Sequence, residues 1–323
     1  MILNTLSAMV LGLCINMLNG RPKFFKTIEN FILSVSHSLE QKLTDKYKDT
    51  PDAQRVAGGV HLIIMLAIFA LIPLGLIILG YLLQPVAGIL LETFIFWFCL
   101  DLKTARVKTS GIMRSLRSGN VAFAKKKLRD LTDSDTSLEN EQDIVRNTVE
   151  YTADISVNGG YAPLFYMAIF GGFGAVFYKV LWLLNNENEK NATENISFGK
   201  AAKKLWSALG IIPAYIGSWF TLADVKFLMF DMRNAKRIHK RDHQNADPKF
   251  LGEVRSVVAG ALGIRLNPVE VYDGGIYRQK AMGYEFRQCS ANDIHWANQL
   301  FYGGVFSLFV ICAVLRAVIF LIF

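Results

Sequence analysis

Val60–Leu83 (VHLIIMLAIFALIPLGLIILGYLL) decides the fold class of this protein, because its 24 residues include no Asp, Glu, Lys or Arg. A helix needs about 20 mainly apolar residues to cross the hydrocarbon core of a bilayer. The segment is therefore predicted to span a membrane. Gln84 and Pro85 follow it, and Val86–Leu102 then runs back as the second arm of a helical hairpin, with Glu92 inside it.

The other apolar segments extend this prediction to the whole chain. We expect an all-α integral membrane protein with about six transmembrane helices and largely helical cytoplasmic loops, in a single membrane domain over residues 1–323. Residues 1–18 could instead be a cleaved signal peptide, but they lack the positively charged start of such peptides, so we favour an uncleaved span. The spans are predicted at about 1–18, 60–83, 86–102, 160–184, 205–230 and 300–323.

The composition supports this class. Of the 323 residues, 52% are hydrophobic and 19% are charged, whereas a soluble domain has about 45–50% and about 25%. The apolar residues gather in long runs, which excludes an ordinary soluble enzyme, and 23 Phe with 11 Tyr exclude a disordered chain. The four cysteines show no metal-ligand spacing and are predicted to be free thiols.

The basic residues predict the orientation of the chain. The predicted loops 19–59, 103–158 and 231–298 hold 28 of the 35 Lys and Arg residues. Because cytoplasmic loops carry the excess of Lys and Arg, these loops are predicted to be cytoplasmic and both termini to face outward. The orientation in the membrane then accounts for the net charge of +8, and no nucleic acid is expected as a partner. The run 236–241 (KRIHKR) is interpreted as a face attracted to anionic lipid, in preference to an anion-binding patch.

Two polar segments of these loops are candidate sites. Asp133–Thr136 (DSDT) is either an acidic capping segment, with Thr136 or Ser137 leading into the next helix, or a cation or phosphate site. Capping is favoured. Tyr272 precedes a glycine pair, Gly274-Gly275, whose backbone amides could approach a ligand.

The order of short motifs along the chain resembles the CobD/CbiB family of inner-membrane adenosylcobinamide-phosphate synthases of cobalamin biosynthesis. The resemblance runs from about residue 20 to residue 297. It rests on RVAGG at 55–59, on 118–136 (SGNVAFAKKKLRDLTDSDT), RNTVE at 146–150, APLF at 162–165, AGALG at 259–263, Tyr272 with Gly274-Gly275, and Asp293-Ile294.

The resemblance implies a bacterial inner-membrane ligase that depends on ATP and Mg²⁺. Such an enzyme activates a corrinoid carboxylate by phosphoryl transfer and joins it to the amine of an aminopropanol phosphate. It also implies membrane lipid, a corrinoid or other small acid, and a second copy or partner protein as partners. The implied site residues are Glu150, Asp154, Asn158 and Lys179 for catalysis, Thr136, Tyr272, Gly274 and Gly275 for the cofactor, and Asp133 and Asp135, with Glu150, for the metal.

The chain departs from the family's pattern at several acids. The family's A-E-N-T-S-D-G reads Ala153–Gly159 (ADISVNG), so that a Glu becomes Asp154 and an acid becomes Asn158. Because a lost carboxylate removes charge that would hold Mg²⁺, two hypotheses stay open: a divergent ligase, and a non-catalytic membrane scaffold or signalling modulator like the AmpE-type proteins. A transporter built on the intramembrane charges Glu92 and Arg316 is the least favoured. Other family acids are replaced at Arg21, Asn185, Trp206, Ser207 and Arg255.

Overall fold

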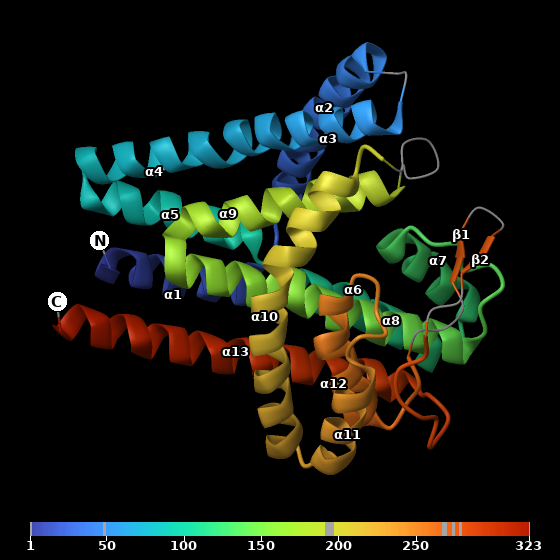
Figure 1. Cartoon of the computed structure of the whole chain (residues 1–323). Helices are drawn as coiled ribbons and strands as arrows, with labels where there is room; N and C mark the ends of the chain where they lie inside the picture. Colours follow the sequence, from blue (N-terminus) through green and yellow to red (C-terminus); the bar gives the residue numbers. More distant parts are fainter. Residues whose placement is uncertain are drawn as a thin grey trace. The chain divides into compact units, whose positions relative to one another are not determined.

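The computed structural model describes residues 2–47, 50–190, 197–266, 270–272, 275–277 and 280–322. The described chain is almost wholly helical, which confirms the predicted all-α class (Figure 1). The helices are α1 (Ile2–Asn19), α2 (Lys23–Lys46), α3 (Pro51–Leu66), α4 (Ile72–Leu83), α5 (Pro85–Cys99), α6 (Leu102–Arg117), α7 (Val121–Thr132), α8 (Glu141–Ser156), α9 (Ala162–Lys190), α10 (Lys200–Phe227), α11 (Met232–Asp242), α12 (Gly252–Leu262) and α13 (Ala291–Ile322).

Three shorter kinds of element join these helices. A π-helix, η1 (Ala67–Leu71), joins α3 to α4, and a second, η2 (Val157–Tyr161), joins α8 to α9. A 3₁₀ turn, η3 (Lys249–Leu251), precedes α12. The strands β1 (Glu270–Tyr272) and β2 (Gly275–Tyr277) form an antiparallel pair, a small addition to the predicted all-α architecture.

Five helical stretches of the described chain are long and apolar enough to cross a membrane. The N-terminal apolar helix is shorter, at Asn4–Asn19. Together with this shorter helix, the five stretches agree with a membrane protein of about six spans. The five stretches are Asp52–Leu83, Pro85–Arg117, Glu141–Asn188, Lys200–Phe227 and Ala291–Val318.

The chain divides into two compact units, which we describe separately. Unit 1 comprises Met1–Asp101, Ala162–Leu209 and Cys312–Phe323. Unit 2 comprises Leu102–Tyr161 and Gly210–Ile311.

In unit 1, α4 and α5 form the helical hairpin that the sequence predicts. Gln84 alone separates them, and its extended backbone reverses the chain before Pro85 begins α5. Glycines let the two helices approach: a Cβ atom on Gly88 would lie 2.3 Å from the Tyr81 ring. Helix α4 is apolar all round: Ile77 and Gly80 are buried, whereas Leu76, Ile78 and Leu79 are exposed.

Helix α9 of unit 1 contains a break. Gly171 has φ 66° and ψ −157°, a conformation available almost only to glycine. The amide of Gly172 donates to Glu92 Oε1 at 3.1 Å, and Arg316 Nε donates to the carbonyl of Ala168 at 2.8 Å. Glu92 and Arg316, two of the charged residues that the sequence places within predicted spans, therefore contact the backbone of one interrupted helix.

In unit 2, α12 packs closely against α11. A Cβ atom on Gly260 would lie 2.7 Å from the Cα of Ala235, and the Asn234 side chain donates to the carbonyl of Gly260 at 2.6 Å. The small residues of 259–263 (AGALG) therefore allow α12 to pack closely against α11. Every residue of α12 except Glu253 is buried, so the position of this helix is fixed along its whole length.

Candidate functional site

A buried charged cluster joins α8 to α12 in unit 2. Arg255 of α12 holds Asp154 of α8 with two hydrogen bonds, Nε to Oδ1 at 2.5 Å and Nη2 to Oδ2 at 2.5 Å. Its Nη1 forms an ion pair with Oε1 of Glu150. Arg255 is 6% exposed and Glu150 is 5% exposed. We call these three residues the Arg255 cluster.

The local sequence explains how α8 presents its two acids. Asn140 begins the helix: its side chain accepts from the amide of Asp143 at 3.0 Å, and the Asp143 carboxylate accepts from the amide of Asn140 at 3.3 Å. This capping box satisfies two amides that a helix start leaves without partners. Glu150 and Asp154 then follow four residues apart, which places them on the same helix face.

Burying the charges of the Arg255 cluster costs free energy, and this cost is offset only while the arginine and both carboxylates are present. Taking ionised groups out of water is expensive, and a buried ion pair recovers this cost only with good geometry. The two parallel bonds between Arg255 and Asp154 are the bidentate arrangement in which guanidinium binds carboxylate best. Asp154 retains access to solvent at its side chain, which is 23% exposed against 6% for Glu150. It is the carboxylate of the cluster that a second molecule could reach.

Asn158 extends the polar region into η2. Its amide nitrogen donates to the backbone carbonyl of Asp154 at 3.1 Å, where α8 passes into the π-helix. All five residues of η2 are buried. A Cβ atom on Gly160 would lie 2.7 Å from Val305, so the helix is pressed against α13 at this point. Single π-turns within α-helices are frequent at functional sites.

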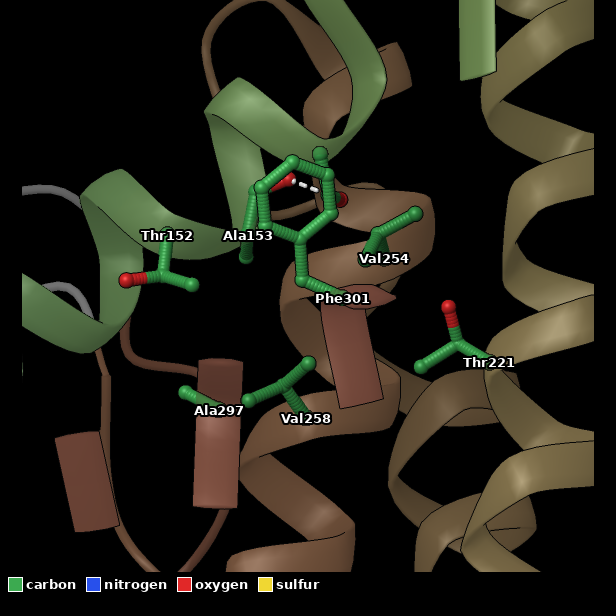
Figure 2. Close-up of a pocket in the computed structure, with 8 residues that line it drawn as sticks. Thr152, Ala153, Thr221, Val254, Val258, Ala297 and Phe301 are labelled. Atoms are coloured by element: carbon green, nitrogen blue, oxygen red, sulfur yellow. Dashed lines mark hydrogen bonds between the residues drawn. The ribbon is translucent and has the colours of Figure 1, made fainter. Parts of the chain in front are cut away.

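A narrow gap lies beside the cluster, between α8, α10, α12 and α13 (Figure 2). Three hydroxyl groups line it, but each donates to a carbonyl of its own helix: Thr152 to Thr148 at 2.8 Å, Ser156 to Ala153 at 2.6 Å and Thr221 to Gly217 at 2.8 Å. The gap has no room for a water molecule. Its lining residues are Thr152, Ala153, Ser156, Thr221, Val254, Val258, Ala297 and Phe301.

Lys179, the cation expected to hold a phosphate, belongs to unit 1. It is 0% exposed, and its Nζ lies 3.0 Å from Asp101 Oδ2 and 3.2 Å from Glu29 Oε1. Arg21 contacts the same two acids, at 3.1 Å and 2.5 Å. The ammonium group also lies 4.3 Å from the ring of Trp182. Two cations and two carboxylates thus form one buried network, and the phosphate role of Lys179 stays a prediction.

The segment Asp133–Thr136 has a different capping role from the one predicted. The backbone of Asp133 is left-handed, with φ 55°, and its amide closes α7 by donating to the carbonyl of Arg129 at 2.8 Å. Thr136 Oγ1 donates to the carbonyl of Lys125 at 3.1 Å. The expectation that Thr136 or Ser137 leads into the next helix is wrong, because Asn140 supplies the reciprocal cap of α8.

Asp135 is exposed, and its carboxylate accepts from the amide of Ser137 at 3.0 Å. Hydrogen bonds from the backbone and side chain of Ser137 lower the pKa of Asp135, so the carboxylate is charged at neutral pH. The metal role assigned to Asp133 and Asp135 stays a prediction, as does the nucleotide role of Thr136.

The glycine turn is described only in part. Tyr272 ends β1 and Gly275 begins β2, and the two residues are paired in the hairpin register. Gly274 lies outside the described residues. The proposed approach of a ligand to this backbone therefore stays a prediction.

The described residues do not fit a resident divalent cation. They contain no group of three or more His, Cys, Asp or Glu side chains placed to hold a metal ion. Mg²⁺ needs several oxygen ligands in near-octahedral geometry. Glu150 and Asp154 lie on one face of α8, but the guanidinium of Arg255 already holds both carboxylates.

Sequence reasoning identified both acids of the Arg255 cluster but noted Arg255 only as a departure from a pattern. Arg255 is the one basic residue of Gly252–Leu262 (GEVRSVVAGAL), a helix otherwise built of small and apolar residues and a single acid, Glu253. A charge in such a helix must find a partner when the helix is buried. That signal was present in the sequence, although it does not say which acid is the partner.

Comparison with known proteins gives one family. A family model described as "CobD/Cbib protein" matches residues 9–301. The Cobalamin biosynthesis protein CobD of Clostridium perfringens is 25% identical over 312 residues, which cover 94% of this chain and 97% of that protein. The proteins of the same name from Streptococcus sanguinis and Photorhabdus laumondii are 28% and 29% identical, over 71% and 80% of this chain and 72% and 81% of theirs. No solved structure matches the chain. Because the family model covers most of its length, the chain belongs to the CobD/CbiB family of cobalamin biosynthesis.

Proposed function

We propose that this protein joins a corrinoid carboxylate to the amine of an aminopropanol phosphate, at the expense of ATP. The observation that carries the proposal is the extent of the family match, since the chain is similar to a Cobalamin biosynthesis protein CobD over 97% of that protein's length. The inner membrane is the proposed location, with the three basic loops in the cytoplasm.

The residues of unit 2 suggest how such a reaction would be assisted. An amine loses a proton as it attacks an activated carboxyl group, and a positioned carboxylate can accept it. Asp154 is the candidate base, because it is the more accessible acid of the Arg255 cluster and Arg255 fixes its orientation. We assign no step to a metal ion, because the described residues do not fit one.

Genetic complementation tests the proposal. The gene is expressed in a bacterium that lacks its own CobD-type gene and that grows only when it makes cobalamin from a corrinoid carboxylate. Growth is expected with the natural chain and is expected to be lost with Asp154→Asn. Asp130→Asn, which changes an exposed carboxylate of α7 in the same way, is the matched control.

A biochemical assay accompanies the growth test. Membranes that contain the protein are supplied with the corrinoid carboxylate, the aminopropanol phosphate and ATP, and mass spectrometry looks for the amide product. If the chain inserts into the membrane and supports neither growth nor product formation, the proposal fails.

One observation favours a second candidate, a non-catalytic relative that acts as a membrane scaffold or signalling modulator. Both acids of α8 that a ligase would use are bound to Arg255 of the same chain. In that case Asp154→Asn leaves the physiological effect of the protein intact wherever the variant still folds. Binding of ATP without product would likewise favour the second candidate.

A further inference from the structure

We propose that Arg255 is a built-in cation that takes the place of a divalent metal ion between Glu150 and Asp154. The two carboxylates lie one turn apart on α8, and both bind the same guanidinium. Oxygens of both carboxylates are therefore directed at the same cationic group. Convergent carboxylate oxygens around a cation are the arrangement in which proteins bind Mg²⁺ or Mn²⁺, and here the cation is a side chain.

The charges of the cluster explain why a cation must be present. Glu150 is almost fully buried, and Asp154 lies beside it. Two neighbouring carboxylates in such a place repel each other and lose hydration, so they need a positive charge between them. Arginine supplies this charge permanently, because its guanidinium does not lose its proton in proteins. A bound metal ion would instead depend on the metal concentration.

The position of Arg255 is fixed by packing. It lies on α12, whose residues are buried except for Glu253, and Gly260 of the same helix is in close contact with α11. The guanidinium uses Nε, Nη1 and Nη2 toward the two acids, so it fills the space between their oxygens. A metal ion cannot enter without displacing it.

The consequence is that Arg255 neutralises the two carboxylates of the cluster without a divalent cation. The described residues hold no group of three or more His, Cys, Asp or Glu side chains that could bind a metal ion, so a metal-binding measurement has little competing signal from them. Arg255 plays this part whatever reaction the protein performs. A failed growth test would remove the proposed function and leave this assignment untouched.

The experiment measures metal binding by the purified full-length chain in detergent. Free Mn²⁺ is followed by electron paramagnetic resonance, and thermal unfolding is recorded with EDTA and with millimolar Mg²⁺. The natural chain is expected to show the same unfolding temperature in both conditions. Arg255→Ala is expected to bind Mn²⁺ at least tenfold more tightly than the natural chain. The same variant is expected to unfold at a higher temperature in Mg²⁺ than in EDTA.

Two further variants keep the test decisive. Arg255→Met fills the space of the arginine stem without charge, and it is expected to gain the same metal dependence if Arg255→Ala does not fold. Adding Glu150→Gln and Asp154→Asn to either variant is expected to remove the gain. The proposal is overturned if the natural chain already binds Mn²⁺ through Glu150 and Asp154, or if a folded variant without Arg255 gains no affinity.

Discussion

Glu92 and Arg316 bind opposite sides of one break in helix α9. Glu92 accepts a hydrogen bond from the amide of Gly172, at the start of the second half of the helix, at 3.1 Å. Arg316 donates to the carbonyls of Ala168 and Met167, at the end of the first half, at 2.8 Å and 3.3 Å. The negative group thus meets the positive end of one half-helix and the positive group meets the negative end of the other.

Replacing Glu92 should show the value of this arrangement. In the natural chain Glu92 accepts hydrogen bonds from the amide of Gly172 and from the hydroxyl of Tyr81, at 3.1 Å and 2.7 Å. Glu92→Leu removes this acceptor from both donors. An unsatisfied buried polar group costs about 1–3 kcal/mol, so a clear fall in the unfolding temperature is expected. Glu92→Gln keeps an acceptor oxygen and should lose less.

Asp52→Asn is the matched control for the Gln variant, because its side chain is 86% exposed. It should leave the unfolding temperature unchanged. Equal stability of the Leu variant and the natural protein would contradict the role given to Glu92.

Gly171 should not tolerate a side chain. Its φ of 66° disfavours any L residue, and a Cβ atom would lie 2.7 Å from Glu92 Oε1. Gly171→Ala is therefore expected to lower the stability by about 1–3 kcal/mol, measured by thermal unfolding. Gly75→Ala in α4 meets nothing within 4 Å and should be neutral or slightly stabilising. A pair of equally stable variants would refute the claim of a strained break.

Lys179 should be essential to the buried network of unit 1. After Lys179→Met, Arg21 is the one cation of the network left to pair with Glu29 and Asp101. Breaking a buried ion pair costs about 3–5 kcal/mol. The protein should express poorly or unfold at a markedly lower temperature. Lys26→Met, at an exposed position of α2, is the control. Adding Asp101→Asn to Lys179→Met should restore part of the stability, because it removes the charge left over, and no restoration would argue against the pairing.

Asp242 should make the stability of the protein fall in acid. Burial by itself would raise its pKa, but hydrogen bonds from Arg241 and from the amide of Gly283, together with the charge of Arg241, lower it overall. A carboxyl group with a lowered pKa stabilises the fold above its unfolded pKa, about 3.9, and this contribution is lost as the pH falls through the folded value.

Asp242→Asn should therefore be less stable than the natural protein at pH 7, and the difference should shrink below about pH 4. Unfolding temperatures recorded across this range provide the measurement. A difference that stays constant down to pH 3 would show that Asp242 contributes through packing and not through its charge.

Helix starts were predicted less well than helices. The DSDT segment and the Asn140–Asp143 pair both carry the residue types that cap helices, and Asn140 lies only seven positions after Asp133. The reciprocal hydrogen bonds of the second pair decide where α8 begins. Competing local signals of this kind are resolved by the backbone path, which the sequence does not state.

What the sequence by itself determined is which segments are apolar enough to lie in a membrane and which are polar enough to lie in water. The uncharged run 60–83 predicts a membrane helix and Gln84-Pro85 predicts a hairpin, because each property depends only on residues that are close together along the chain. Motif order also indicated the family.

What only the tertiary structure decided is which charge meets which. Arg255 is about one hundred residues from the acids that it binds, and Arg316 is farther still from the carbonyls that it caps. Periodicity describes one helix at a time, whereas a buried charge is satisfied by whichever helix packs against it. The identity of the cation at Glu150 and Asp154 therefore followed from the packing of α12 on α8, and from nothing local to either helix.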